Sequence, residues 1–181
     1  MFLVYLILMK NKFLVVVNGS SCSGKSSLCR VIDKANDRIV RISYDQVKRW
    51  ISNYSPERDF IDVYRILTAM SEEIFSMGMN AYFDGAIYKK EREVIIVSAK
   101  EYGYKIVELN IDIDYSVARE RFQERIDIKK SNPNALISNV SPEKHRRIYD
   151  LYNNEKNLKA ISLDSLKFSP DELYEQVRSN F

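Results

Sequence analysis

The stretch that decides the fold reads FLVVVNGSSCSGKSS and runs from Phe13 to Ser27. Its first five residues are apolar, which is typical of a strand buried on both faces of a parallel sheet. A loop of Gly, Ser and Cys follows and closes on the sequence GKS. Because turn-forming residues replace strand-forming ones within two positions, we expect a strand, a tight loop and then a helix from Lys25 to about Lys34.

The loop from Gly19 to Ser26 matches the pattern G-x-x-x-x-G-K-[ST]. Glycines let successive backbone N–H groups point into one concavity that binds anions, and the helix that follows adds its positive dipole end. We therefore expect a nucleoside triphosphate, ATP or GTP, with Lys25 on its β- and γ-phosphates and Ser26 on Mg²⁺. The residues expected to bind the nucleotide are Gly19, Ser20, Ser21, Cys22, Ser23, Gly24, Lys25, Ser26 and Ser27.

Length and composition indicate one globular domain. The chain has 181 residues, 45% of them hydrophobic, and a formal net charge of +3, which permits a polyanionic partner without requiring one. Its two cysteines, Cys22 and Cys29, have no metal or redox spacing and are typical of a reduced, cytoplasmic protein.

The N-terminal sequence MFLVYLILMK is apolar, but it falls far short of the ~20 residues that span a bilayer. It also lacks the basic region that precedes the apolar run of a signal peptide. We therefore expect no membrane contact, and we interpret residues 1–8 as an extension and residues 9–181 as a single domain. The sequence does not predict an oligomeric state.

Strand-like and helix-like segments alternate about five times along the chain. The expected strands are 13–17, 39–43, 81–83, 105–111 and 160–163, and helices are expected to begin near residues 25, 56, 89, 115, 142 and 170. Such alternation predicts right-handed crossovers between parallel strands. The expected fold class is α/β, a three-layer α/β/α sandwich with a mostly parallel five-stranded sheet and a helical lid at about 119–140.

The sequence favours a phosphotransferase over the other proteins that use such a loop. It contains no N-K-x-D or T-K-x-D motif for guanine recognition, which a GTPase-like switch needs. It also has no hydrophobic strand that ends in the Asp-Glu pair of a mechanical ATPase. Asp45 follows the second expected strand, and ligands of open α/β sheets bind beyond the carboxyl ends of the strands. Its carboxylate is a candidate general base for a substrate hydroxyl. The alternative is that Asp45 only caps the helix QVKRWI.

Three further side chains are candidates for the site. Asp84 ends the third strand, where it is expected to bind Mg²⁺ together with Ser26 or to orient the acceptor; the alternative is a plain turn residue. Arg121 and Arg125 share one helical face, and from a lid they would stabilise charge on the transferred phosphate; the alternative is a solvated charged face. Arg119 is expected at the surface.

The motifs GSSCSGKSS, SYDQVKR (43–49), FDG (83–85), ARERFQER (118–125) and LDSLKFSPDEL (163–173) follow one another along the chain. In this order the chain resembles the P-loop kinases that include polynucleotide 5′-hydroxyl kinases, zeta toxins and chloramphenicol phosphotransferases. The resemblance implies a P-loop kinase domain that binds ATP and Mg²⁺, with Asp45 as general base and Arg121 and Arg125 as phosphate clamps. Together with Lys25, these are the expected catalytic residues. Arg92 falls near a position where polynucleotide kinases keep an arginine.

Three functions remain open. A kinase of polynucleotide 5′ ends needs basic groups and stacking aromatics, for which Trp50, Tyr54, Tyr44 and Tyr88 are candidates. A kinase of a small molecule, such as a nucleotide sugar, an antibiotic or a metabolite, predicts an enclosed pocket lined by Tyr44, Tyr64 and Tyr88. A regulatory domain would bind ATP without transferring its phosphate.

Two residues that often carry chemistry are interpreted as structural. His145 lies in the polar sequence PEKHRR with no visible partner, and we expect it at the surface. Cys22 is expected to be a tolerated residue of the loop, although the helix end beside it is a place where a thiol pKa falls.

Overall fold

The core of the structure is one five-stranded sheet. The computed structural model describes residues 12–85, 88–132 and 140–181. The strands are β1 (Phe13–Gly19), β2 (Val40–Ser43), β3 (Ala81–Asp84), β4 (Lys105–Asp112) and β5 (Ile161–Asp164). They lie in the order β2-β3-β1-β4-β5, and all four pairings among these strands are parallel. The predicted fold class, α/β with a mostly parallel five-stranded sheet, is confirmed.

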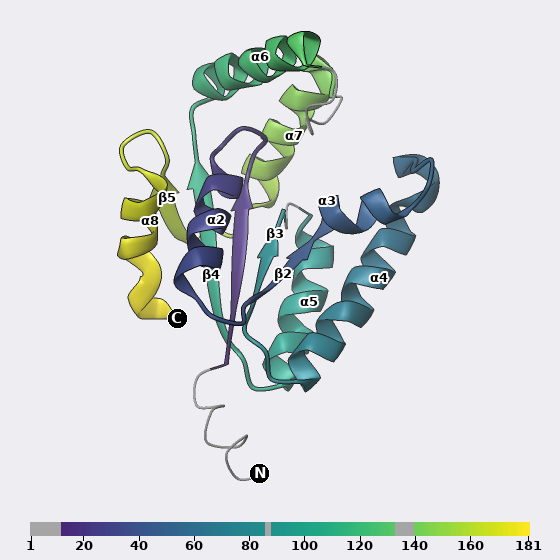
Figure 1. Cartoon of the computed structure of the whole chain (residues 1–181), viewed down its shortest axis with the longest axis vertical. Coiled ribbons are helices and arrows are strands. Elements are labelled where there is room, and N and C mark those ends of the chain that lie inside the picture. The colour runs from purple at the N-terminus through teal and green to yellow at the C-terminus, as the bar shows by residue number, and fades with distance from the viewer. Residues whose placement is uncertain (1–11, 86–87, 133–139) are drawn as a thin grey trace.

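The helices of the described ranges are α2 (Lys25–Ala35), α3 (Tyr44–Val47), α4 (Pro56–Ser76), α5 (Lys89–Glu101), α6 (Tyr115–Ser131), α7 (Pro142–Glu155) and α8 (Pro170–Val177). Two 3₁₀ turns, η1 (Lys48–Trp50) and η2 (Arg178–Asn180), follow α3 and α8. Helices α6 and α7 lie at the end of the molecule toward which the strands point (Figure 1). Helix α6, which contains residues 119–131 of the predicted lid, therefore stands over the carboxyl edge of the sheet.

Strand β1 shows how the sheet divides the core into two layers. Leu14 and Val16 pack into a cluster with side chains of α4 and α5, whereas Val15 and Val17 pack with side chains of α2 and α8. Successive side chains of a strand point to opposite faces, and every residue of β1 is buried. The continuous apolar run from Phe13 to Val17 is thus required by burial on both faces of the sheet.

The helix boundaries follow local signals in the sequence. Helix α4 starts with Pro56 in its first turn, and α8 starts with a capping box in which Ser169 and Glu172 each bond the backbone of the other. Gly103 follows α5 with a φ of 77°, a left-handed conformation that favours glycine. Helix α4 ends at Ser76, and Met77, its C-cap residue, is 48% exposed.

Two predicted segments lie outside the described residues. They are the extension at 1–8 and the part of the lid at 133–139. Within the described ranges, no helix has the length and apolar character that crossing a membrane requires.

Leu67 tests the core between α4 and the sheet. Its side chain is fully buried, so Leu67→Ala should lower the free energy of unfolding by about 2–5 kcal/mol through lost burial and a residual cavity. Chemical denaturation measures this change. Ile61→Ala on the same helix is the matched control, because Ile61 is 69% exposed and should change stability by about 0.5 kcal/mol or less. Equal losses in the two variants would contradict the packing described here.

Candidate functional site

The loop between β1 and α2 has a backbone that only its glycines allow. Gly19 is tightly enclosed: an added Cβ would lie 2.5 Å from Ser23 Oγ and 3.0 Å from the carbonyl oxygen of Ile111. Gly24, the N-cap of α2, has a φ of 98°, which L-residues with side chains rarely adopt. Both glycines of the motif are therefore needed to close the loop at the start of the helix.

This loop leaves hydrogen-bond donors without partners. Among the described residues, no backbone or side-chain acceptor binds the amides of Gly24, Lys25 and Ser26. The hydroxyl of Ser23 is fully buried and is likewise unpartnered in the described parts of the chain. Buried polar groups in native proteins are nearly always paired, so a concavity of free donors at a helix N-terminus indicates an anion-binding site.

The Lys25 side chain lies across the loop. Its Nζ donates to the carbonyl oxygens of Gly19 and Ser20, at 2.6 Å each. Burial lowers the pKa of Lys25, and the charges of Asp84 and Asp45 oppose that fall. The ammonium is thus held beside the free amides by two carbonyls, which a phosphate oxygen can replace as its partners.

Asp45 lies in the first turn of α3, just beyond the end of β2. The interpretation that it only caps a helix is wrong, because Ser43 occupies the N-cap position. Its carboxylate is 59% exposed and pairs through Oδ1 with Lys48. It is near enough to Lys25 to act on its pKa. The structure therefore brings a solvent-accessible carboxylate to the same edge of the sheet as the loop.

Asp84, at the end of β3, is buried, and its Oδ2 accepts a hydrogen bond from Arg41. Its Oδ1 accepts no hydrogen bond from any residue in the described ranges. Ser26 is exposed in the first turn of α2. One hydroxyl and one carboxylate oxygen suit Mg²⁺, which in nucleotide sites takes few protein ligands and several phosphate or water oxygens. The described residues contain no cluster of three or more His, Cys, Asp or Glu side chains suited to a metal.

The lid helix α6 contacts the loop through one of its two candidate arginines. Arg121 Nη1 donates to the carbonyl oxygen of Cys22 at 3.4 Å. Arg125, one turn further along, is exposed, as is Arg119. The structure thus brings Arg121 to the loop, whereas Arg125 forms no hydrogen bond or ion pair with the described residues of the loop and acts on His145 through its charge. Arg119 has the surface position expected of it.

His145 is not at the surface, and the prediction that it would be is wrong. Its ring is 1% exposed and stacks on Phe122 of α6 at a centroid distance of 4.3 Å. Burial lowers its pKa, the backbone of Ser21 opposes this, and the charge of Arg125 adds to it. The residue was missed because α7 is polar along most of its length, and only its packing beneath α6 buries this side chain.

The aromatic residues beside Asp45 pack against one another. Tyr44 and Tyr64 have ring centroids 5.1 Å apart, Phe60 lies 5.1 Å from Tyr88, and the hydroxyls of Tyr44 and Tyr54 are 2.5 Å apart. Burial, followed by the Tyr54 hydroxyl, raises the pKa of Tyr44. Tyr44, Tyr64 and Tyr88 therefore pack with Phe60 into one aromatic cluster, and the pocket expected along them stays a prediction.

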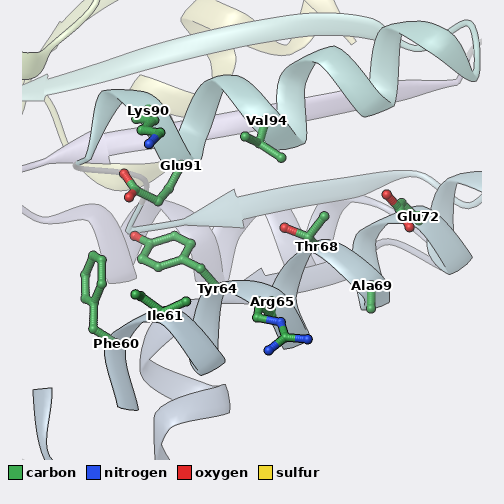
Figure 2. A pocket seen from close by; sticks show the side chains of 10 residues that line it. All are labelled: Phe60, Ile61, Tyr64, Arg65, Thr68, Ala69, Glu72, Lys90, Glu91 and Val94. Atoms are coloured by element: carbon green, nitrogen blue, oxygen red, sulfur yellow. The ribbon is translucent and has the colours of Figure 1, made fainter. Parts of the chain in front are cut away.

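A groove of about 520 Å³ lies on the outer side of this cluster, between α4 and α5. Figure 2 shows the Tyr64 hydroxyl and the Glu91 carboxylate pointing toward each other across it. Ile61 and Val94 supply exposed apolar surface to the same groove. It lies on the outer face of the helices and does not include Asp45 or the loop.

Arg92 is buried between secondary-structure elements. It is 3% exposed, donates to the carbonyl oxygen of Glu155 at 3.0 Å and lies 3.7 Å from Glu108. These contacts join α5, β4 and the end of α7. Arg92 is therefore buried where these three elements meet, and its resemblance to the arginine of polynucleotide kinases stays a prediction.

Residues 14–147 match the family model described as an AAA domain (AAA_33). The chain belongs to this family. The match runs from β1 into α7 and contains the loop, Asp45, Asp84 and Arg121. Comparison with curated proteins returned no match.

Solved structures share the fold of this AAA domain. A protein of the PezAT toxin–antitoxin system of Streptococcus pneumoniae superposes with a TM-score of 0.68 at 16% identity, over 92% of this chain and 78% of that one. The Pnkp1/Rnl/Hen1 RNA repair complex gives 0.62 at 18% identity, over 82% and 47%. The APS kinase CysC of Mycobacterium tuberculosis, in complex with AMPPNP and APS, gives 0.60 at 14% identity, over 94% and 97%. At such low sequence identity, these superpositions show a common fold and nothing beyond it.

The buried His145 predicts a pH dependence of stability. Its pKa is lower in the folded than in the unfolded chain, so protonation favours unfolding. The native state should lose stability as the pH falls below about 6.5, the ordinary pKa of histidine. Urea unfolding between pH 5 and pH 8 measures the slope. His145→Phe keeps a stacking ring and should flatten that slope, whereas parallel curves for the two proteins would exclude His145 as its source.

Proposed function

We propose that this protein is an ATP-dependent phosphotransferase that moves the γ-phosphate of ATP to a substrate hydroxyl. The observation that carries the proposal is that the amides of Gly24, Lys25 and Ser26, beside the Lys25 ammonium, have no acceptor among the described residues. An anion with several oxygens satisfies all of these donors at once. The kinase fold shared with the APS kinase supports the same assignment.

In the proposed step, the acceptor hydroxyl gives its proton to Asp45 as its oxygen attacks the γ-phosphorus. The new oxygen–phosphorus bond forms while the bond from the γ-phosphorus to the bridging oxygen breaks, and ADP leaves. Lys48 holds Oδ1 of Asp45 and leaves Oδ2 for the acceptor. The loop amides, Lys25 and Arg121 stabilise the charge that develops on the phosphate oxygens.

Ser26 and Asp84 are the residues that would hold Mg²⁺ with the nucleotide. When bound, the ion supplies positive charge to the β- and γ-phosphate oxygens. Ser26 lies in the first turn of α2 and Asp84 at the end of β3, which supports this assignment.

For the acceptor, we favour a polynucleotide 5′-hydroxyl end. Trp50 is 63% exposed in η1, the turn that follows α3 and contains Lys48 and Arg49. An exposed aromatic beside basic side chains suits a base and its phosphate. The likeness to the RNA repair complex supports this choice.

A transfer screen with γ-labelled ATP tests the proposal. The acceptors are 5′-hydroxyl DNA and RNA and a panel of nucleotide sugars, antibiotics and metabolites. We expect label on a polynucleotide end. Label on a small molecule would retain the kinase and overturn the acceptor. Nucleotide binding without transfer to any acceptor would favour a regulatory domain, and the absence of nucleotide binding would refute the proposal.

In the same screen, Asp45→Asn should leave ATP binding nearly intact and reduce transfer by about 10²–10⁴-fold, the usual loss for a general base. ATP affinity, measured by calorimetry, separates this loss from a binding defect. Unchanged turnover would remove Asp45 from the role of base.

Arg121→Ala should reduce kcat/KM for ATP by about 10²-fold or more, because a charged donor to the transferred phosphate is lost. Arg125→Ala should act in the same direction, because Arg125 lies one turn from Arg121 on the same helical face. Arg119→Ala is the matched control on the same helix and should leave the kinetics unchanged. A result in which all three variants behave like the unmodified protein would show that the lid arginines are only a solvated face.

A further inference from the structure

The register of the sheet makes Arg41 and Asp84 neighbours. Strands β2 and β3 pair Ser43 with Asp84, so Arg41, two residues before Ser43, is diagonal to Asp84. Ile42 packs in the layer formed with α4 and α5, and the side chains on either side of it therefore face α2. Arg41 and Asp84 thus share the face that lies beneath the phosphate loop.

These two side chains form an ion pair between a buried carboxylate and a guanidinium whose side chain is 34% exposed. Arg41 Nη2 donates to Asp84 Oδ2, and the carboxylate side chain is 9% exposed. Burial acts to lower the pKa of Arg41, but the hydrogen bond and charge of Asp84 outweigh it and raise the pKa. Arg41 Nε is buried and has no partner in the described parts of the chain. Asp84 is therefore the group that holds this guanidinium in place.

Lys25 is a second cation within electrostatic reach of Asp84. After burial, Asp84 has the largest influence on the pKa of Lys25. The two nevertheless form no ion pair, because Lys25 Nζ lies on the carbonyl oxygens of Gly19 and Ser20. Asp84 is neutralised from the β2 side by Arg41, and the lysine is left at the loop.

We propose that Arg41 is a positioning residue for the nucleotide: by pairing with Asp84 it keeps Lys25 at the phosphate loop. This inference rests on the proposed nucleotide-binding function. Without Arg41, the buried carboxylate loses its ion-pair partner while Lys25 stays within its electrostatic reach, and an uncompensated buried charge is costly. Lys25 is then drawn toward Asp84, and the extra negative charge beneath the loop repels the phosphates.

The test is a double-mutant cycle read by ADP binding in EDTA, measured by calorimetry. Metal-free ADP excludes any effect of Asp84 through Mg²⁺. Arg41→Met should weaken ADP binding by about tenfold, the scale of one uncompensated charge in a partly buried site. In the Asp84→Asn background the same substitution should have no further effect, because the carboxylate that Arg41 neutralises is gone.

Arg41→Lys keeps the charge and should bind ADP nearly as well as the unmodified protein, even if Arg41→Met proves unstable. Arg58→Met is the matched control, since Arg58 pairs with the buried Asp59 at the start of α4, outside the loop, and it should leave ADP binding unchanged. Equal losses from Arg41→Met with and without Asp84→Asn, or no loss at all, would overturn the inference. Failure of the unmodified protein to bind ADP would instead overturn the proposed function.

Discussion

The structure depends on a short stretch of backbone that is held in shape while its own donors stay unpaired. The amides of Gly24, Lys25 and Ser26 have no acceptor in the described parts of the chain, although unpaired donors near the interior cost free energy. They stay in place because Gly19 is enclosed by Ser23 and Ile111 and because β1 is buried along its whole length. The sheet thus acts as the rigid support of an anion site.

The parallel sheet also determines which charges meet at that site. The carboxyl ends of parallel strands lie at one edge, so side chains that are distant in sequence are brought to one place. Asp45 from the end of β2 and Asp84 from the end of β3 come to the same edge as Lys25. Each carboxylate has a basic partner, but the Asp45 carboxylate is exposed and the Asp84 carboxylate is buried, and this difference in environment separates their proposed roles.

Most of the fold was predictable from the sequence because its signals are local. The apolar run before the loop, the glycine pattern and the capping residues each specify a conformation within a few residues. His145 and Arg41 were not predictable in this way. The first is buried by packing against Phe122, and the second acquires its role from the register that sets β2 against β3.

Trp50 is the chain's single tryptophan, and it lies largely exposed in the turn just after the helix that contains Asp45. Its indole emission therefore comes from one corner of the molecule, without contributions from other tryptophans. An acceptor that stacks on Trp50 would change the wavelength and intensity of its fluorescence. A nucleotide bound at the loop alone would leave this fluorescence largely unaltered. The protein thus contains an intrinsic fluorescent probe for binding of the phosphate acceptor.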